Sequence, residues 1–465
     1  MKSTYKEFPK PIAFKKLIGP SFIILALGLG SGEVILWPYM AANYGLGIAW
    51  GAILGITFQY FINMEIERYA LIKGESVFVG LNRLFKWTAY WFIMSTFIGF
   101  GLPGIIAASA HVFASLLGID EYKWIAIAFL IIIGLILSAG KTVYGLMEKI
   151  TRTVIMIGVP FIFLIAIYIS SKSDWSDLAA GIIGRGADYS FFPEGLVLAT
   201  FLAAFAYSGA GGNLNLTQSI YVKEKGYGMG KYSQKIAGLF VAKKDEKIKL
   251  SGENFEITKT NIARYKEWWR RISIEHLLVF WLIGSISMLL LMLLAYTTAY
   301  GVTGNAEGIN FVITEGSAIA QLTFPLLGTL FLAVVTIMLF QTQLGVMDST
   351  SRIMAENYAE KKLGKNEKAK INLSKIYYSF LWAQIAFGCL LFLFNISEPK
   401  TLLVLGAVIN AFAMFIHIAL VSILNNKTLP KIFHPSWPRK LILLLIFVFF
   451  GYFSILVLGD KLGIF

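Results

Sequence analysis

Long apolar runs, separated by short polar segments, follow one another along almost the whole chain. A helix needs roughly 20 apolar residues to cross the hydrocarbon core of a bilayer. Stretches of this kind occur eleven times, at Ile18–Asn43, Gly47–Ile72, Trp87–Leu117, Trp124–Ala139, Ile150–Ser170, Gly195–Val222, Ile272–Tyr296, Leu322–Asp348, Leu373–Phe394, Thr401–Leu424 and Leu441–Leu458. The pattern predicts an all-α polytopic membrane protein with eleven transmembrane helices in a lipid bilayer.

The positions of the basic residues predict which loops face the cytoplasm. Lys and Arg are enriched in the cytoplasmic loops of membrane proteins. If the N-terminus is cytoplasmic and the spans alternate, 36 of the 41 basic residues fall on the cytoplasmic side. The five outside are Lys123, Lys172, Arg185, Lys400 and Lys461. We therefore predict a multi-pass protein of the plasma membrane, with its N-terminus cytoplasmic and its C-terminus external.

The composition agrees with this topology and disfavours several other classes of protein. Hydrophobic residues make up 57% of the chain and charged residues 15%, whereas about a quarter of the residues of a soluble domain are charged. The net charge of +14 is explained by the cytoplasmic loops, so we do not expect nucleic acid as a partner. The single cysteine, Cys389, excludes an intrachain disulfide. The sequence has no Walker, HExxH or GxSxG motif, so neither an enzyme nor a tightly bound cofactor is expected.

Glycine-rich segments interrupt two of the predicted spans, the first and the sixth. The residues concerned are Gly30, Ser31, Gly32 and Glu33 in the first span, and Tyr207, Ala210, Gly211, Gly212 and Asn213 in the sixth. Each glycine lowers helix stability by about 1 kcal/mol relative to alanine. Unwound backbone is tolerated in a membrane protein where it is buried or lines a cavity. We interpret these nine residues as a substrate-binding site. The alternative is that the glycines only permit close helix packing.

The two interruptions lie five spans apart. This spacing is expected of two inverted five-helix repeats followed by one further helix. It divides the chain into a cytoplasmic tail at 1–17, a first repeat at 18–170, an external loop at 171–194, a second repeat at 195–424, and a linker with the last span at 425–465. The second repeat contains a long cytoplasmic loop, 223–271, for which we consider a small hairpin at Lys247–Ile257. Most other loops are short, so a monomeric transport unit is expected.

Glu33 is the only acidic residue near the middle of any predicted span. A carboxylate at this depth is costly unless it is paired or protonated, and no Lys or Arg lies at a similar depth. Glu33 is therefore a candidate metal ligand or proton carrier. The alternative is a neutral side chain hydrogen-bonded to the unwound backbone. Gln341 and Asn410 are candidate pathway residues in the eighth and tenth spans, or form interhelical hydrogen bonds.

Three groups of residues form a recognisable pattern, namely Gly19–Phe22 with Tyr44, Gly45 and Trp50, then Asn213, Leu214 and Leu216, and finally Gln341–Glu356. These segments resemble the Nramp family of proton-coupled divalent-metal transporters. The resemblance implies a LeuT-like fold and a cytoplasmic N-terminus. The motifs of the metal site differ from those of the family. Its Asp-Pro-Gly-Asn corresponds to Gly30–Glu33, and its Met-Pro-His corresponds to Ala210–Gly212. The thioether ligand and the histidine associated with proton movement are thus absent from these positions.

Broken spans without a catalytic motif favour a secondary-active transporter that works by alternating access, with a channel as the competing class. We expect a divalent cation as substrate, carried through a remodelled site with Glu33 as its tentative metal ligand, and coupled to H+ or Na+. One alternative is a transporter of a small organic solute, such as an amino acid or amine, because Gly30 and Gly212 would leave a roomier cavity. The other is a relative that has lost metal transport.

Overall fold

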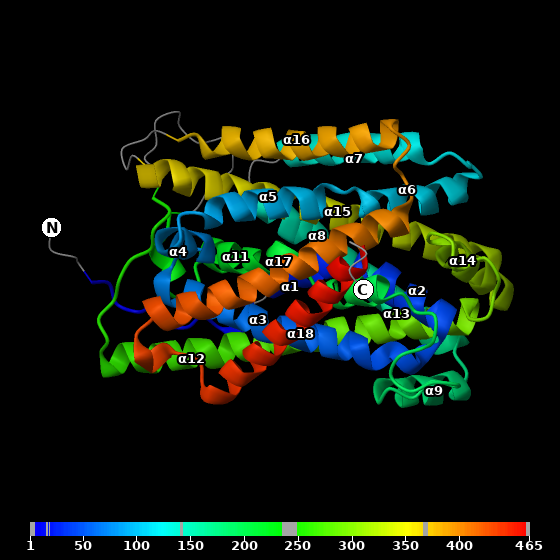
Figure 1. Ribbon diagram of the computed structural model, residues 1–465, viewed down its shortest axis with the longest axis horizontal. Coiled ribbons are helices and arrows are strands. Elements are labelled where there is room, and N and C mark those ends of the chain that lie inside the picture. Colours follow the sequence, from blue (N-terminus) through cyan, green and yellow to red (C-terminus); the bar gives the residue numbers. More distant parts are fainter. Residues whose placement is uncertain are drawn as a thin grey trace.

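The computed structural model describes residues 5–14, 17, 19–139, 143–234, 249–365 and 371–461. The described residues form helices and connecting segments, together with two isolated bridges, Lys6–Phe255 and Arg185–Ser190. The long helices run side by side along one common direction (Figure 1). Apolar side chains of most of these helices meet in one large core cluster, with a second cluster on α6, α7, α15 and α16, so the fold is an all-helical bundle.

A helix or a pair of helices occupies each of the eleven apolar stretches. In chain order they are α1 (Pro20–Gly28) with α2 (Trp37–Tyr44), α3 (Ala49–Lys73), α5 (Thr88–Gly101) with α6 (Gly104–Leu117), α7 (Lys123–Ala139), α8 (Val143–Ile169), α10 (Leu198–Ala206) with α11 (Thr217–Lys225), α12 (Lys259–His276) with α13 (Ile283–Ala299), α15 (Pro325–Lys365), α16 (Leu373–Leu393), α17 (Pro399–Thr428) and α18 (Trp437–Lys461). Of the described helices, nine are long and apolar enough to cross a membrane. Helix α7 is shorter, and the break between α10 and α11 divides the sixth stretch.

Helix α12 corrects the prediction that 223–271 is a loop throughout. It begins at Lys259 because the Thr258 side chain caps it by accepting a hydrogen bond from the Asn261 amide. Its charged residues concealed it in the sequence, yet Trp268 is buried on its inner face. The hairpin expected at Lys247–Ile257 lies partly outside the described residues. From residue 249 onward no hairpin forms, and Phe255 pairs with Lys6 instead.

Three further helices lie in segments that were predicted to be loops or span ends. They are α4 (Val77–Leu84), α9 (Lys172–Ile182) and α14 (Asn310–Leu322). Helix α9 lies within the predicted external loop, and a capping box between Ser171 and Asp174 starts it. The eighth stretch also continues well past Asp348, because α15 ends only at Lys365.

The N-terminal segment lies at the same end of the bundle as the turns that follow α3, α11 and α17. The Lys6 amide donates to the Asn254 carbonyl at 2.9 Å, and Trp268 Nε1 donates to the Pro9 carbonyl at 3.0 Å. The ring of Phe433, after α17, packs on Tyr265 of α12 at 4.7 Å. The gathering of these segments at one end agrees with an alternating path of the chain through the bundle.

Candidate functional site

The interruption in the first span is a wide turn rather than a fully unwound segment. Helix α1 ends at Gly28, Leu29–Ser31 form a turn, and Gly32–Leu36 form a π-helix, η2, that continues into α2. Leu29 and Ser31 both keep right-handed helical backbone angles. The predicted unwinding of this span is therefore only partial. Single π-turns of this kind often mark functional positions in helices.

The interruption in the sixth span is a true break. Helix α10 ends at Ala206. A 3₁₀ turn, η4 (Gly212–Leu216), follows the break, and α-helix resumes with α11. Gly209, Gly211 and Gly212 have φ values of 154°, 71° and 51°. These angles strain any residue with a side chain, whereas glycine adopts them freely. The glycines of this span therefore shape the break itself.

The two interruptions are in direct backbone contact. A Cβ atom on Gly28 would lie 2.6 Å from the carbonyl carbon of Gly209, and one on Gly32 would overlap the Tyr207 carbonyl oxygen. A Cβ atom on Gly30 would overlap the Thr342 side chain of α15, and one on Gly212 would overlap Asn410. Close approach thus accounts for these glycines in this conformation. The expectation of a roomier cavity beside Gly30 and Gly212 was wrong, because Thr342 and Asn410 fill the space.

Gln59 of α3 holds the ends of the unwound segment together. Its Nε2 donates to the Ala206 carbonyl at 2.9 Å, and its Oε1 accepts from the Gly211 amide at 3.1 Å. Trp37 Nε1 donates to Ser208 Oγ at 2.9 Å from the opposite side. Sequence reasoning did not identify Gln59. A signal was present, because Gln59 lies four residues before Asn63 and eight before Glu67, so the three polar residues share one helix face.

Two asparagines beside the break have a fixed amide nitrogen and an unpartnered amide oxygen. Asn410 Nδ2 donates to the Tyr207 hydroxyl at 2.9 Å and to the Gly99 carbonyl at 3.0 Å. Asn213 Nδ2 donates to Ser95 Oγ at 2.8 Å and to Thr96 Oγ1 at 3.0 Å. Both Oδ1 atoms are buried without a hydrogen-bond partner among the described residues. Such oxygens are suitable ligands for a hard cation.

Glu33 is fully buried, and neither of its carboxylate oxygens has a hydrogen-bond partner in the described part of the chain. A Cβ atom on Gly284 of α13 would lie 3.7 Å from Glu33 Oε1, with Ile56 and Leu25 nearer still. The carboxylate therefore borders α13. The alternative role for Glu33 was a hydrogen bond to the unwound backbone. Glu33 makes no such bond to any described residue.

The remaining predicted residues are also buried at or near the joint of the two spans. Ser31 and Ala210 lie within the two interruptions. Gln341 is buried on α15 next to Thr342, which packs against Gly30. Thr342 Oγ1 also donates to the Ala26 carbonyl at 3.2 Å. The structure thus brings α1, α10, α15 and α17 together at one point.

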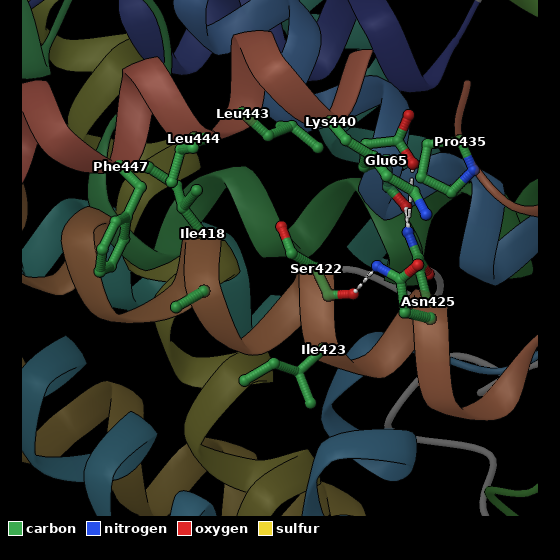
Figure 2. Close-up of a pocket in the computed structure, with 12 residues that line it drawn as sticks. Glu65, Ile418, Ser422, Ile423, Asn425, Pro435, Lys440, Leu443, Leu444 and Phe447 are labelled. Carbon is green, nitrogen blue, oxygen red and sulfur yellow. Dashed lines mark hydrogen bonds between the residues drawn. The ribbon is translucent and has the colours of Figure 1, made fainter. Parts of the chain in front are cut away.

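A cavity of about 290 Å³ lies between α17 and α18, away from this joint. Glu65 and Asn425 lie at one end of it and Phe447 at the other (Figure 2). Apolar side chains of α17 and α18 form most of its wall. None of the predicted site residues lines this cavity, so we do not consider it the substrate site.

No model of a known protein family matches the sequence, and no curated protein matches it either. Solved structures do match. A manganese transporter from Eremococcus coleocola aligns over 99% of this chain and 90% of its own, with 12% identity and a TM-score of 0.73. MHP1, a nucleobase-cation-symport-1 family transporter, aligns over 96% and 93% with 12% identity and a TM-score of 0.53. MhsT in complex with L-phenylalanine aligns over 94% and 97% with 12% identity and a TM-score of 0.50.

These similarities are similarities of fold, because the identities are low. The Nramp resemblance detected in the sequence is confirmed at this level. The other two neighbours agree with a LeuT-like arrangement of helices.

Proposed function

We propose that the protein is a secondary-active membrane transporter that moves a small, hard divalent cation through the joint of its first and sixth spans. In this proposal the chain crosses the membrane eleven times, in two inverted five-helix repeats followed by one further helix, and its N-terminus is cytoplasmic. The fold of the structural neighbours supports transport as the class of function. The main support for a cation as the substrate is a pair of buried amide oxygens without hydrogen-bond partners among the described residues, Asn213 Oδ1 and Asn410 Oδ1, beside the unwound backbone.

The chemistry of the donors favours a hard cation over a soft one. Amide, hydroxyl and carbonyl oxygens suit Mg²⁺, Ca²⁺ and Mn²⁺, whereas thioethers select softer metals. Ala210–Gly212 supply no sulfur or imidazole ligand. The described residues contain no group of three or more His, Cys, Asp or Glu side chains placed to hold a metal. The transported ion would therefore keep part of its hydration shell, and Glu33 would supply the negative charge near its path.

The close contact of the two interruptions implies that the site opens by helix movement. Gly28 and Gly209 touch through their backbones, and Thr342 fills the space beside Gly30. A cation can reach the amide oxygens only when these helices separate, as they do in alternating access.

Calorimetric titration of the purified full-length protein with Mn²⁺, Mg²⁺ and Ca²⁺ tests this proposal. Asn410→Ala and Glu33→Gln should each weaken binding by roughly tenfold or more, because each removes an oxygen ligand or the local charge. Asn426→Ala is a matched control on the same helix, since Asn426 is exposed and donates only to the Ser422 carbonyl. The absence of binding by all three ions would overturn the cation proposal. Stabilisation by L-phenylalanine or a small amine would then favour the organic solute.

A further inference from the structure

A buried polar face on α3 leads from the sixth-span break toward the end of the bundle that holds the N-terminal segment. Gln59, Asn63 and Glu67 follow one another at intervals of four residues, so they share one helix face. Gln59 contacts the break, and Glu67 Oε1 accepts a hydrogen bond from Gln218 Nε2 of α11 at 2.6 Å. Asn63 lies between them and is fully buried, with neither amide atom partnered by a described residue.

The facing segment of the sixth span carries matching polar groups without partners. Asn215 of η4 is fully buried, and neither its Nδ2 nor its Oδ1 has a hydrogen-bond partner in the described ranges. Gln218 Oε1 is likewise without a partner. Buried polar atoms of protein interiors are nearly always satisfied. This concentration of unsatisfied groups therefore indicates a place for a bound species, such as a proton or water, that the polypeptide itself does not supply.

A second group of polar side chains lies next to this face, where α1 meets α12. Ser21 Oγ lies 2.6 Å from Glu275 Oε2 and 2.9 Å from His276 Nδ1, so it links the two side chains. The His276 ring is stacked on Phe280 at 4.7 Å and on Tyr60 at 5.6 Å. Glu275 Oε1 and His276 Nε2 have no partner among the described residues.

Glu67 and Glu275 lie on two helices, α3 and α12, that pack against each other, since the Tyr60 hydroxyl of α3 donates to the Ser273 carbonyl of α12 at 3.4 Å. If both carboxylates were ionised, their charges would repel each other across this contact. Both side chains are buried, with 1% and 2% of their surface exposed. The titratable or charged groups around them are His276, Tyr60 and Arg439, and the guanidinium of Arg439 is already paired with Glu65 at 2.9 Å. Two like charges cannot both remain in a dry site without a compensating charge.

We propose that Glu67 and Glu275 together hold one proton, and that this pair with Ser21 and His276 is the coupling-proton site of the transporter. The site rests on the proposed transport function, but it is separate from the cation ligands at the break. Asn63, Asn215 and Gln218 connect it to the break through positions that water can bridge.

Ser21 provides a balanced route for the proton between Glu275 and His276. The Glu275 Oε2–H bond breaks as the proton passes to Ser21 Oγ, and the Ser21 Oγ–H bond breaks as its proton passes to His276 Nδ1. The products are a carboxylate, an unchanged serine hydroxyl and an imidazolium, so the total charge is conserved. The reverse transfer restores the starting state, so the proton can move between Glu275 and His276 without leaving the buried cluster.

Infrared pH titration of the purified full-length protein tests this site without any transport assay. A protonated carboxylic acid has a C=O stretch that a carboxylate lacks. We expect Glu67→Gln and Glu275→Gln each to abolish or shift the same titrating C=O component, because the two groups are coupled. Glu315→Gln is a matched control, a buried glutamate on α14 outside this cluster, and it should leave that component in place. Size-exclusion profiles and melting temperatures establish that each variant is folded.

Two results would overturn the proton site. One is a set of C=O components that respond to neither substitution, and the other is a pair of components that disappear independently of each other. Mn²⁺ flux into liposomes under a pH gradient separates this failure from failure of the transport function. Flux that persists unchanged in Glu67→Gln and ignores the gradient overturns the coupling role alone. A coupled carboxyl component in a protein that shows no Mn²⁺ flux supports the shared proton and overturns the proposed transport of this ion. Ser21→Ala should keep the component and slow proton-driven flux.

Discussion

The Tyr207 carbonyl oxygen lies against Gly32 so closely that a Cβ atom on residue 32 would overlap it. This contact joins the π-turn of the first span to the end of α10, where the sixth span unwinds. Because the neighbouring atom is backbone rather than the tip of a flexible side chain, it cannot move aside without shifting the break itself. The joint is therefore a position where even one methyl group has a structural consequence.

Gly32→Ala is expected to destabilise the protein by about 1–3 kcal/mol, the usual cost of overpacking a buried site. It should also weaken cation binding, because the two interruptions would be forced apart. Gly364→Ala is the matched control, since Gly364 lies in α15 with nothing within 4 Å of its Cβ position. That substitution should be neutral or slightly stabilising. Thermal unfolding in detergent compares them, and equal melting temperatures for both variants would contradict the proposed contact.

Gln59→Leu is expected to loosen the sixth-span break while leaving the helices around it intact. It leaves the Ala206 carbonyl and the Gly211 amide unsatisfied, at about 1–3 kcal/mol for each buried group. Hydrogen exchange should become faster at residues 207–213. Gln384→Leu is the control, because Gln384 is also buried and hydrogen-bonded, to Thr350 and Ser351, but lies far from the break in sequence. Similar exchange profiles for the two variants would show that Gln59 does not brace the break.

The fold could be predicted largely from the sequence, because length and hydropathy determine where helices can cross a bilayer. Helix α12 was missed because its solvent-facing residues are charged, so only its buried face, with Tyr265 and Trp268, distinguishes it from a loop. The first break was overestimated for a related reason. Glycine content shows where a helix can unwind, but packing decides whether it does, and here the chain retains a π-turn.

The residues at the joint could be named from the sequence, but their neighbours could not. The glycines of both interruptions and Asn410 do come together, since a Cβ atom on Gly212 would overlap Asn410. Thr342 and the pair of Glu67 and Glu275 became visible only in three dimensions, whereas Gln59 was overlooked although its spacing from Asn63 and Glu67 indicated a polar helix face. Which face of a long apolar helix meets which neighbour is determined by tertiary packing, and a mostly apolar helix gives little indication of it.

Asp348 and Arg352 form a buried ion pair where α15 meets α16. Arg352 Nε donates to both carboxylate oxygens at 3.0 Å, and the Tyr377 hydroxyl donates to Asp348 Oδ1 at 2.8 Å. Asp348→Asn should destabilise the protein by about 3–5 kcal/mol, because it leaves a buried guanidinium without its counter-charge. The double variant Asp348→Asn with Arg352→Gln should recover part of this loss in a thermal melt. A double variant less stable than Asp348→Asn would contradict the pairing.

Glu7 and Phe8 attach the N-terminal segment to α12. Arg264 Nη1 donates to Glu7 Oε2 and to the Phe8 carbonyl, each at 2.9 Å. The hydrogen bond and the charge of Arg264 lower the pKa of Glu7 below its usual value of 4.5. A lowered pKa means that the ionised, attached form is favoured at neutral pH, and that this contribution is lost as the pH falls through the lowered value.

A spin label reports this detachment directly. Since Cys389 is the only cysteine, Tyr5→Cys in a Cys389→Ser background carries one label. Its mobility should be low at neutral pH and should rise only as the pH falls below the usual range of a glutamate. With Glu7→Gln added, mobility should already be higher at neutral pH, and this acid transition should be absent. The difference should be modest and should shrink at high salt, because the Glu7 side chain is exposed and its charge is screened. An identical acid transition with and without Glu7→Gln would show that a titrating group other than Glu7 releases the segment.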